Sequence, residues 1–116
     1  MNQNSFHLSN SDISAILCAL PLVLEVSSNS PLQDQLNASY CASAAEKLTN
    51  HSPNLTANET KVISLSISIA VLILSGQGSG FVPEIDSTWK AELSKYFFTY
   101  NRLDPIFQGF LERFHT

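Results

Sequence analysis

The segment SGQGSGF, residues 75–81, has glycine spacing that could form a phosphate-binding loop. A dinucleotide-binding loop requires the pattern GxGxxG directly after a strand and at the start of a helix. Gly76 and Gly78 fit its first two glycines, but Phe81 stands at the third. A P-loop needs Gly-Lys followed by Ser or Thr, and this segment contains no lysine. We therefore expect a linker, and keep a ligand or nucleotide site that uses the Gly76–Gly80 loop as the alternative.

The remaining chemically active residues do not form a recognisable catalytic or metal-binding pattern. His7, His51 and His115 share no metal-ligand spacing with one another or with a cysteine. Cys18 and Cys41 lie far apart and in apolar surroundings, which indicates two reduced core thiols. The serines are numerous, but none lies in a GxSxG motif. The sequence predicts a non-enzymatic protein with no catalytic, metal-binding or cofactor-binding residues.

Charge restricts the classes of partner. The chain has ten acidic and six basic residues among 116, and its net charge is -4. Lys47 and Lys61 are the only basic residues before Lys90, so direct binding of nucleic acid, which needs clustered basic residues, is not expected. The first ten residues contain no basic residue and no long apolar run, so we expect no signal peptide and a cytoplasmic location. Because few residues are charged, we expect part of the surface to be able to bind another protein or a second copy of the chain.

The segment KVISLSISIAVLIL, residues 61–74, alternates apolar residues with serine as a strand would. Upstream, Thr56 and Glu59 have the spacing of a helix capping box, and Leu55 could form the accompanying hydrophobic staple. Gly76 follows at the position where helices commonly end. These signals favour a helix, although a strand at 61–75 remains the alternative. Its strongly apolar part is shorter than the roughly twenty residues that cross a bilayer, so membrane insertion is not expected.

An earlier segment repeats this opening at an offset of 47 residues. Ser9 aligns with Thr56, and Asp12 aligns with Glu59. Either the two segments are duplicated helices or the match reflects capping chemistry alone. Within the first helix, Pro21 removes one backbone N–H and crowds the preceding turn, so we expect a kink or a break there.

The helix after the first loop should begin at Ser30, with Pro31 at its first position. Its inward residues are predicted to be Leu32, Leu36, Tyr40 and Leu48, while its alanines leave small faces for close packing.

Two helix starts are predicted in the aromatic C-terminal third. Asp86 or Ser87 should cap a helix that runs to about Thr99, and Asp104 with Pro105 should begin a short last helix. That last helix is too short to persist in water, so its aromatic face must pack either on its own bundle or on a second chain.

Together these patterns predict an all-α fold, a small helical bundle in one domain spanning 1–116. Two helical hairpins, about 9–49 and 56–99, supply four main helices, and a short C-terminal helix covers about 105–114. We expect the chain to act by protein–protein binding, as a regulator, inhibitor or adaptor such as those of phages and mobile elements. The candidate interaction surface comprises Trp89, Tyr96, Tyr100, Phe107, Phe110, Leu111 and Phe114.

Overall fold

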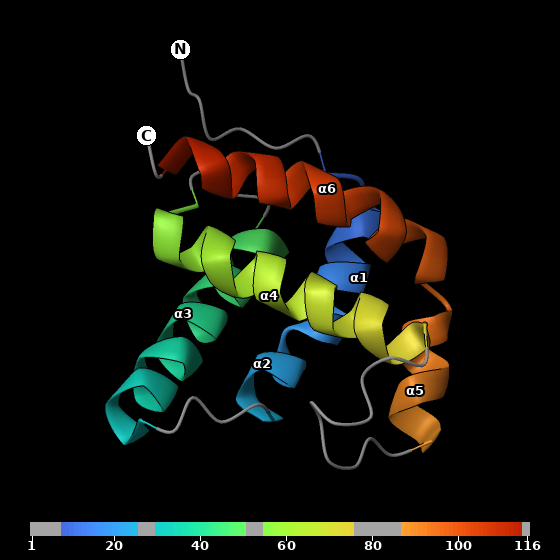
Figure 1. Cartoon of the computed structure of the whole chain (residues 1–116), viewed down its shortest axis with the longest axis horizontal. Helices are drawn as coiled ribbons and strands as arrows, with labels where there is room; N and C mark the ends of the chain where they lie inside the picture. Colours follow the sequence, from blue (N-terminus) through green and yellow to red (C-terminus); the bar gives the residue numbers. More distant parts are fainter. Residues whose placement is uncertain (1–7, 26–29, 51–54, 76–86, 115–116) are drawn as a thin grey trace.

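The computed structural model describes residues 8–25, 30–50, 55–75 and 87–114, although some side chains at 87–89 and 110–114 lie outside this description. The described residues form helices and no strands, so the all-α prediction is confirmed. The helices are α1 (Asn10–Ala19), α2 (Pro21–Glu25), α3 (Pro31–Thr49), α4 (Ala57–Leu74), α5 (Ser87–Ser94) and α6 (Phe97–Phe114). Figure 1 shows α6 lying along α4 in the opposite direction, with α3 and α5 towards opposite ends of the molecule.

The alternating segment 61–74 is helical, and α4 begins where the cap predicts. The Thr56 hydroxyl accepts a hydrogen bond from the Glu59 N–H at 3.1 Å, and the Glu59 carboxylate accepts one from the Thr56 N–H at 2.8 Å. Ser9 and Asp12 form the same reciprocal pair at the start of α1. Each pair satisfies two backbone N–H groups that a helix start would leave without partners.

Helix α4 is the centre of the core and contacts every other helix. By length and composition it could cross a membrane, but 56% of it is buried inside the bundle, as in the core helix of a soluble protein. Its serines allow α6 to approach closely. Ser68 donates a hydrogen bond to Asp104 at 2.9 Å, and Ser64 accepts a weak one from Gln108 at 3.4 Å. Ser66 is buried and donates to the carbonyl of Ile63 in its own helix.

The predicted break at Pro21 is confirmed, because α1 ends at Ala19 and α2 begins at the proline. The start of α3 is also confirmed, with Ser30 as its N-cap and Pro31 in its first turn. The inward face predicted for α3 is wrong in part. Leu32 is 67% exposed and Leu36 is 38% exposed, whereas Leu48 is buried. The C-terminal half of α3 supplies its buried residues, and these include small ones that a search for large apolar residues overlooks.

The predicted helix boundary near residues 100–104 is wrong. The chain turns at Lys95 and Tyr96, where both backbone N–H groups bond to carbonyls three residues earlier. Helix α6 then runs from Phe97 through Pro105 without interruption. Asp104 lies inside α6 and does not begin a helix, and its carboxylate accepts a hydrogen bond from Ser68 on α4. Burial of Leu103 and Phe107 on either side of Pro105 offsets the backbone hydrogen bond that proline cannot make.

Candidate functional site

Three of the predicted interaction residues can be placed, and two of them belong to the core. Tyr100 and Phe107 are fully buried against the other helices, so neither is accessible to a partner. The Tyr100 hydroxyl donates a hydrogen bond to the carbonyl of Ala15 at 2.8 Å, which ties α6 to α1. Burial raises the pKa of this phenol well above its usual range, so it stays protonated. Tyr96 is half-buried and meets the Tyr100 ring edge-on.

The other four predicted residues lie on helices, but their side chains fall outside the described residues. Trp89 is on α5, and Phe110, Leu111 and Phe114 are on the last turns of α6. The Gly76–Gly80 loop also lies outside the described residues, as do all three histidines. Within the part of the chain that the structure describes, no three acidic, cysteine or histidine residues gather as a metal site would require.

An apolar groove of about 230 Å³ lies between α3 and the segment that joins α1 to α2. We call it the α2–α3 groove. One wall consists of Leu17, Leu20, Pro21 and Leu24. The other wall consists of Ala38, Cys41, Ala42 and Ala45 from α3. The groove therefore combines bulky aliphatic side chains on one wall with small ones on the other.

The local sequence explains why this groove is open. Pro21 ends α1 and redirects the chain, which brings Leu20 and Leu24 beside α3. The alanines at 38, 42 and 45 recur at helical spacing, so they form one continuous stripe along α3. Their methyl side chains are too short to reach the facing wall of the groove. Leu24 at the lip is 54% exposed, although leucine is ordinarily buried.

None of the described residues that line the α2–α3 groove carries a formal charge at neutral pH. Cys41 is the only titratable residue that lines it, and burial raises the pKa of its thiol. The thiol is therefore neutral, and it weakly contacts the carbonyl of Leu20 at 4.0 Å. An apolar side chain could enter this groove without stripping water from an ion, whereas a charged ligand would find no partner there.

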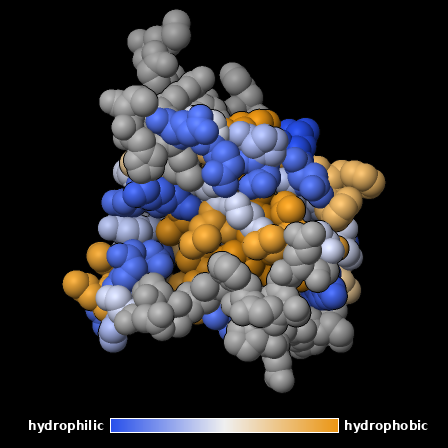
Figure 2. Space-filling model, in the orientation of Figure 1, coloured by the Kyte–Doolittle hydropathy of each residue, from blue (hydrophilic) through white to orange (hydrophobic). Residues whose placement is uncertain are grey.

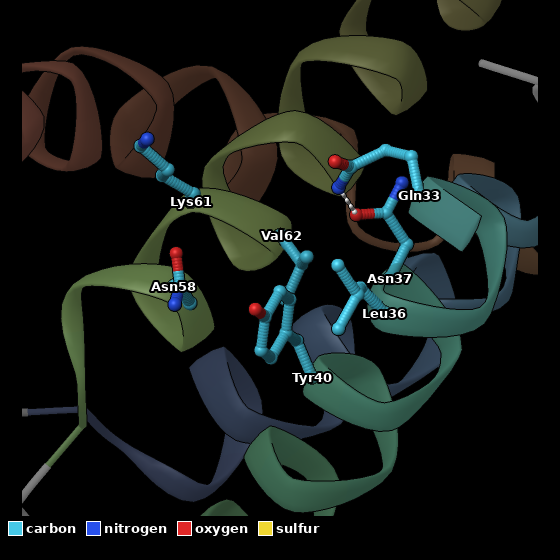
Figure 3. Close-up of a pocket in the computed structure, with 7 residues that line it drawn as sticks. All are labelled: Gln33, Leu36, Asn37, Tyr40, Asn58, Lys61 and Val62. Atoms are coloured by element: carbon cyan, nitrogen blue, oxygen red, sulfur yellow. Dashed lines mark hydrogen bonds between the residues drawn. The ribbon is translucent and has the colours of Figure 1, made fainter. Parts of the chain in front are cut away.

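A second hollow, of about 180 Å³, lies between α3 and the first turns of α4 (Figure 3). It is mostly polar and includes Gln33 and Asn37, whose side chains hydrogen-bond to each other at 2.9 Å. Lys61 is its only charged residue, and Figure 3 shows the Lys61 side chain directed away from the Tyr40 ring. Its polar groups do not converge on one point, so this hollow does not resemble a built ligand site.

Two further apolar areas are exposed. Figure 2 shows one over the middle of α4 and an apolar projection at the edge where α6 begins. Among the apolar residues of α4, Leu65 is 39% exposed. In the first turn of α6, Phe98 is 83% exposed and Phe97 is 39% exposed. Their rings pack edge to face, with centroids 5.3 Å apart and an interplanar angle of 76°. We call this pair the Phe97–Phe98 knob.

Sequence reasoning overlooked both the groove and the knob. The predicted interaction surface included neither Phe97 nor Phe98, and the turn at Lys95 that precedes them was not predicted. The groove could have been found from the alanines of α3, because small residues at helical spacing predict a face on which another element can pack closely. Comparison of the chain with protein-family models, with curated proteins and with solved structures gives no match.

Proposed function

We propose that this chain is a non-enzymatic binding protein that receives an apolar side chain of a protein partner in the α2–α3 groove. The observation that carries the proposal is an open groove, lined by apolar residues and a neutral thiol, with the exposed Leu24 at its lip. Such exposed apolar grooves commonly receive the apolar face of a helix or a single anchoring side chain. A regulator, an inhibitor and an adaptor would each use a surface of this kind.

The chemistry of the groove favours a protein ligand over a small polar molecule. A metabolite would need polar groups placed to fix its orientation, and the lining residues offer only a weakly polar thiol. A partner's side chain is oriented by the rest of the partner, so an apolar groove is sufficient. The alanine stripe also lets the partner's backbone come close to α3, as small residues do where helices pack tightly.

A non-enzymatic role and a cytoplasmic location remain part of this proposal. The second hollow has one cation and neither a carboxylate nor an imidazole in its lining, which gives little support to acid–base chemistry there. Cys18 and Cys41 are both free thiols, as is usual in a reducing compartment.

Site-specific photocrosslinking in cells of the native host tests the proposal. A benzophenone amino acid in place of Leu24 should give a discrete crosslinked product, because this position lies at the lip of the groove. The matched control places it at Gln33, which is exposed on the side of α3 that lines the second hollow. Adding Ala42→Arg, which fills the groove with a charged chain, should abolish the Leu24 product. Equal products at both positions, or persistence with Ala42→Arg, would refute the proposal.

A further inference from the structure

We infer that the partner side chain of the α2–α3 groove is Phe98 of a second copy of this chain. The inference rests on the proposed function and names its partner. Phe98 is the most exposed large apolar side chain among the described residues, and it lies in the first turn of α6. Its ring packs edge to face against Phe97, so the two rings project from α6 as one apolar unit.

The ring and the groove match in size and chemistry. An apolar protein cavity of about 150 Å³ is large enough to bind benzene, and the α2–α3 groove has a volume of about 230 Å³. A phenyl group makes no hydrogen bond, and the groove has almost no hydrogen-bonding capacity to lose. Insertion of Phe98 would remove apolar surface from water on both sides, at Phe98 itself and at Leu24.

Charge complementarity points to a second copy as the source of this phenylalanine. Exposed Lys90 and Lys95 lie on α5 and on the turn that precedes the knob. Exposed Glu25 follows Leu24 at the lip of the groove, and exposed Glu46 lies one turn beyond Ala42 on α3. Lys95 already pairs with Glu92 at 2.9 Å, but both side chains are more than half exposed and can exchange partners.

The same asymmetry extends along the chain. Residues 1–89 contain seven acidic and two basic residues, a net charge of -5, whereas residues 90–116 contain three acidic and four basic residues, a net charge of +1. The part of the chain that carries the knob is thus slightly basic and the part that carries the groove is acidic, and opposite charges favour their encounter.

The arrangement of the helices makes this contact intermolecular. The start of α6 and helix α3 lie towards opposite ends of the longest axis in Figure 1, so the knob cannot reach the groove of its own chain. A single contact of this kind leaves a free groove on one copy and a free knob on the other, which can pair with each other in a closed dimer or bind further copies. One phenylalanine buries about 150–250 Å², far less than the roughly 1,200–2,000 Å² of a stable interface, so association is weak and depends on concentration.

Sedimentation equilibrium on the full chain, at concentrations up to about 1 mM to reach weak affinities, tests this inference. The mass-average of the wild-type chain should rise with concentration above the monomer value of 12.7 kDa. Phe98→Ala and Ala42→Arg should each remain at that value. An equimolar mixture of the two variants should form one-to-one dimers, because it contains one intact groove and one intact knob. Ile106→Ala is the control, since it removes another exposed apolar side chain of α6 and should self-associate like the wild type.

Far-UV circular dichroism of each variant confirms that it is folded before its mass is interpreted. A wild-type chain that stays monomeric at about 1 mM overturns the inference, because even a millimolar dissociation constant would be detected. Self-association that survives Phe98→Ala overturns it as well, as does a mixture that forms no dimers. A monomeric wild type that still gives a Leu24 crosslink to a different protein refutes self-binding and leaves the proposed function standing. Loss of that crosslink would refute both.

Discussion

The carboxylate of Glu59 is buried where α3 meets the start of α4, and its environment predicts how one substitution acts. Its Oε1 atom accepts hydrogen bonds from the Lys47 ammonium at 2.7 Å and from the Thr56 N–H at 2.8 Å. Its Oε2 atom accepts one from the Ser43 hydroxyl. Burial raises the pKa of Glu59, but these donors together outweigh it and hold the pKa below its usual value. The group is therefore ionised in the folded chain at neutral pH.

Lys47→Met keeps the apolar stem of the side chain and removes the ammonium. A hydrogen bond to a charged group contributes about 1.5–3 kcal/mol to stability. The Lys47 side chain is 30% exposed, so water can replace part of the interaction and we expect the lower end, a loss of about 1.5 kcal/mol. For a domain of this size each kcal/mol corresponds to about 4 °C, so Tm should fall by about 6 °C.

Urea denaturation in a double-mutant cycle with Glu59→Gln measures the interaction directly, and Lys95→Met is the matched control. Lys95 pairs with Glu92 on the exposed side of α5, where water and salt screen the pair and it contributes little to stability. The cycle should give a Lys47–Glu59 coupling of about 1 kcal/mol or more. The reasoning is refuted if Lys47→Met costs no more than Lys95→Met, or if the coupling is close to zero.

The same carboxylate predicts the direction of a pH effect. Because the pKa of Glu59 is lower in the folded chain than the roughly 4.3 of an unfolded glutamate, the unfolded state binds protons first on acidification. The stabilisation is fully present above about pH 5 and is lost as the pH falls through the folded pKa. The difference in unfolding free energy between wild type and Glu59→Gln should therefore shrink below about pH 4. A difference that grows in acid would show that the sign is wrong.

Other substitutions test the packing of α6, each by urea denaturation. Phe107→Ala should cost about 3–5 kcal/mol, because its ring is fully buried, and Phe98→Ala about 0.5 kcal/mol or less; equal costs would contradict the placement of α6. Tyr100→Phe loses the hydrogen bond to Ala15 and should cost about 1 kcal/mol; an unchanged unfolding midpoint would argue against that bond. Ser64→Leu should cost about 1–3 kcal/mol by overpacking the contact with α6, and a more stable variant would show unfilled space there.

Helix starts could be predicted from the sequence because capping chemistry is local. Thr56 and Glu59 are three residues apart, so their reciprocal hydrogen bonds are specified before any tertiary contact forms. That local signal correctly outweighed the strand-like alternation of residues 61–74. The alternation has a different cause in the fold, because Ser64 and Ser68 meet α6 while Ser66 bonds within its own helix. A pattern of period two thus arose from two separate packing requirements on one helix.

The course of the C-terminal third could not be predicted by the same means. Asp104 followed by Pro105 has the local chemistry of a helix start, yet both residues lie inside α6. Leu103 and Phe107 on either side of Pro105 are buried in the core, and Asp104 accepts a hydrogen bond from Ser68, which is 36 residues away in the sequence. The turn at Lys95, which places the exposed Phe97–Phe98 knob at the start of α6, was not predicted either. The groove escaped prediction for a related reason, since its two walls come from helices that meet only after the chain turns at Pro21.

The repeat at an offset of 47 residues shows where local resemblance ends. Both openings form capping boxes with a buried acid, and each acid binds a cation on another helix, Arg102 for Asp12 and Lys47 for Glu59. The cations come from different parts of the chain, one 90 residues after its acid and the other 12 residues before it. The two helices also differ in length, with ten residues in α1 and eighteen in α4. The two segments therefore share a capping box that contains a buried acid. The cation that pairs with each acid depends on the tertiary structure and cannot be predicted from the local sequence.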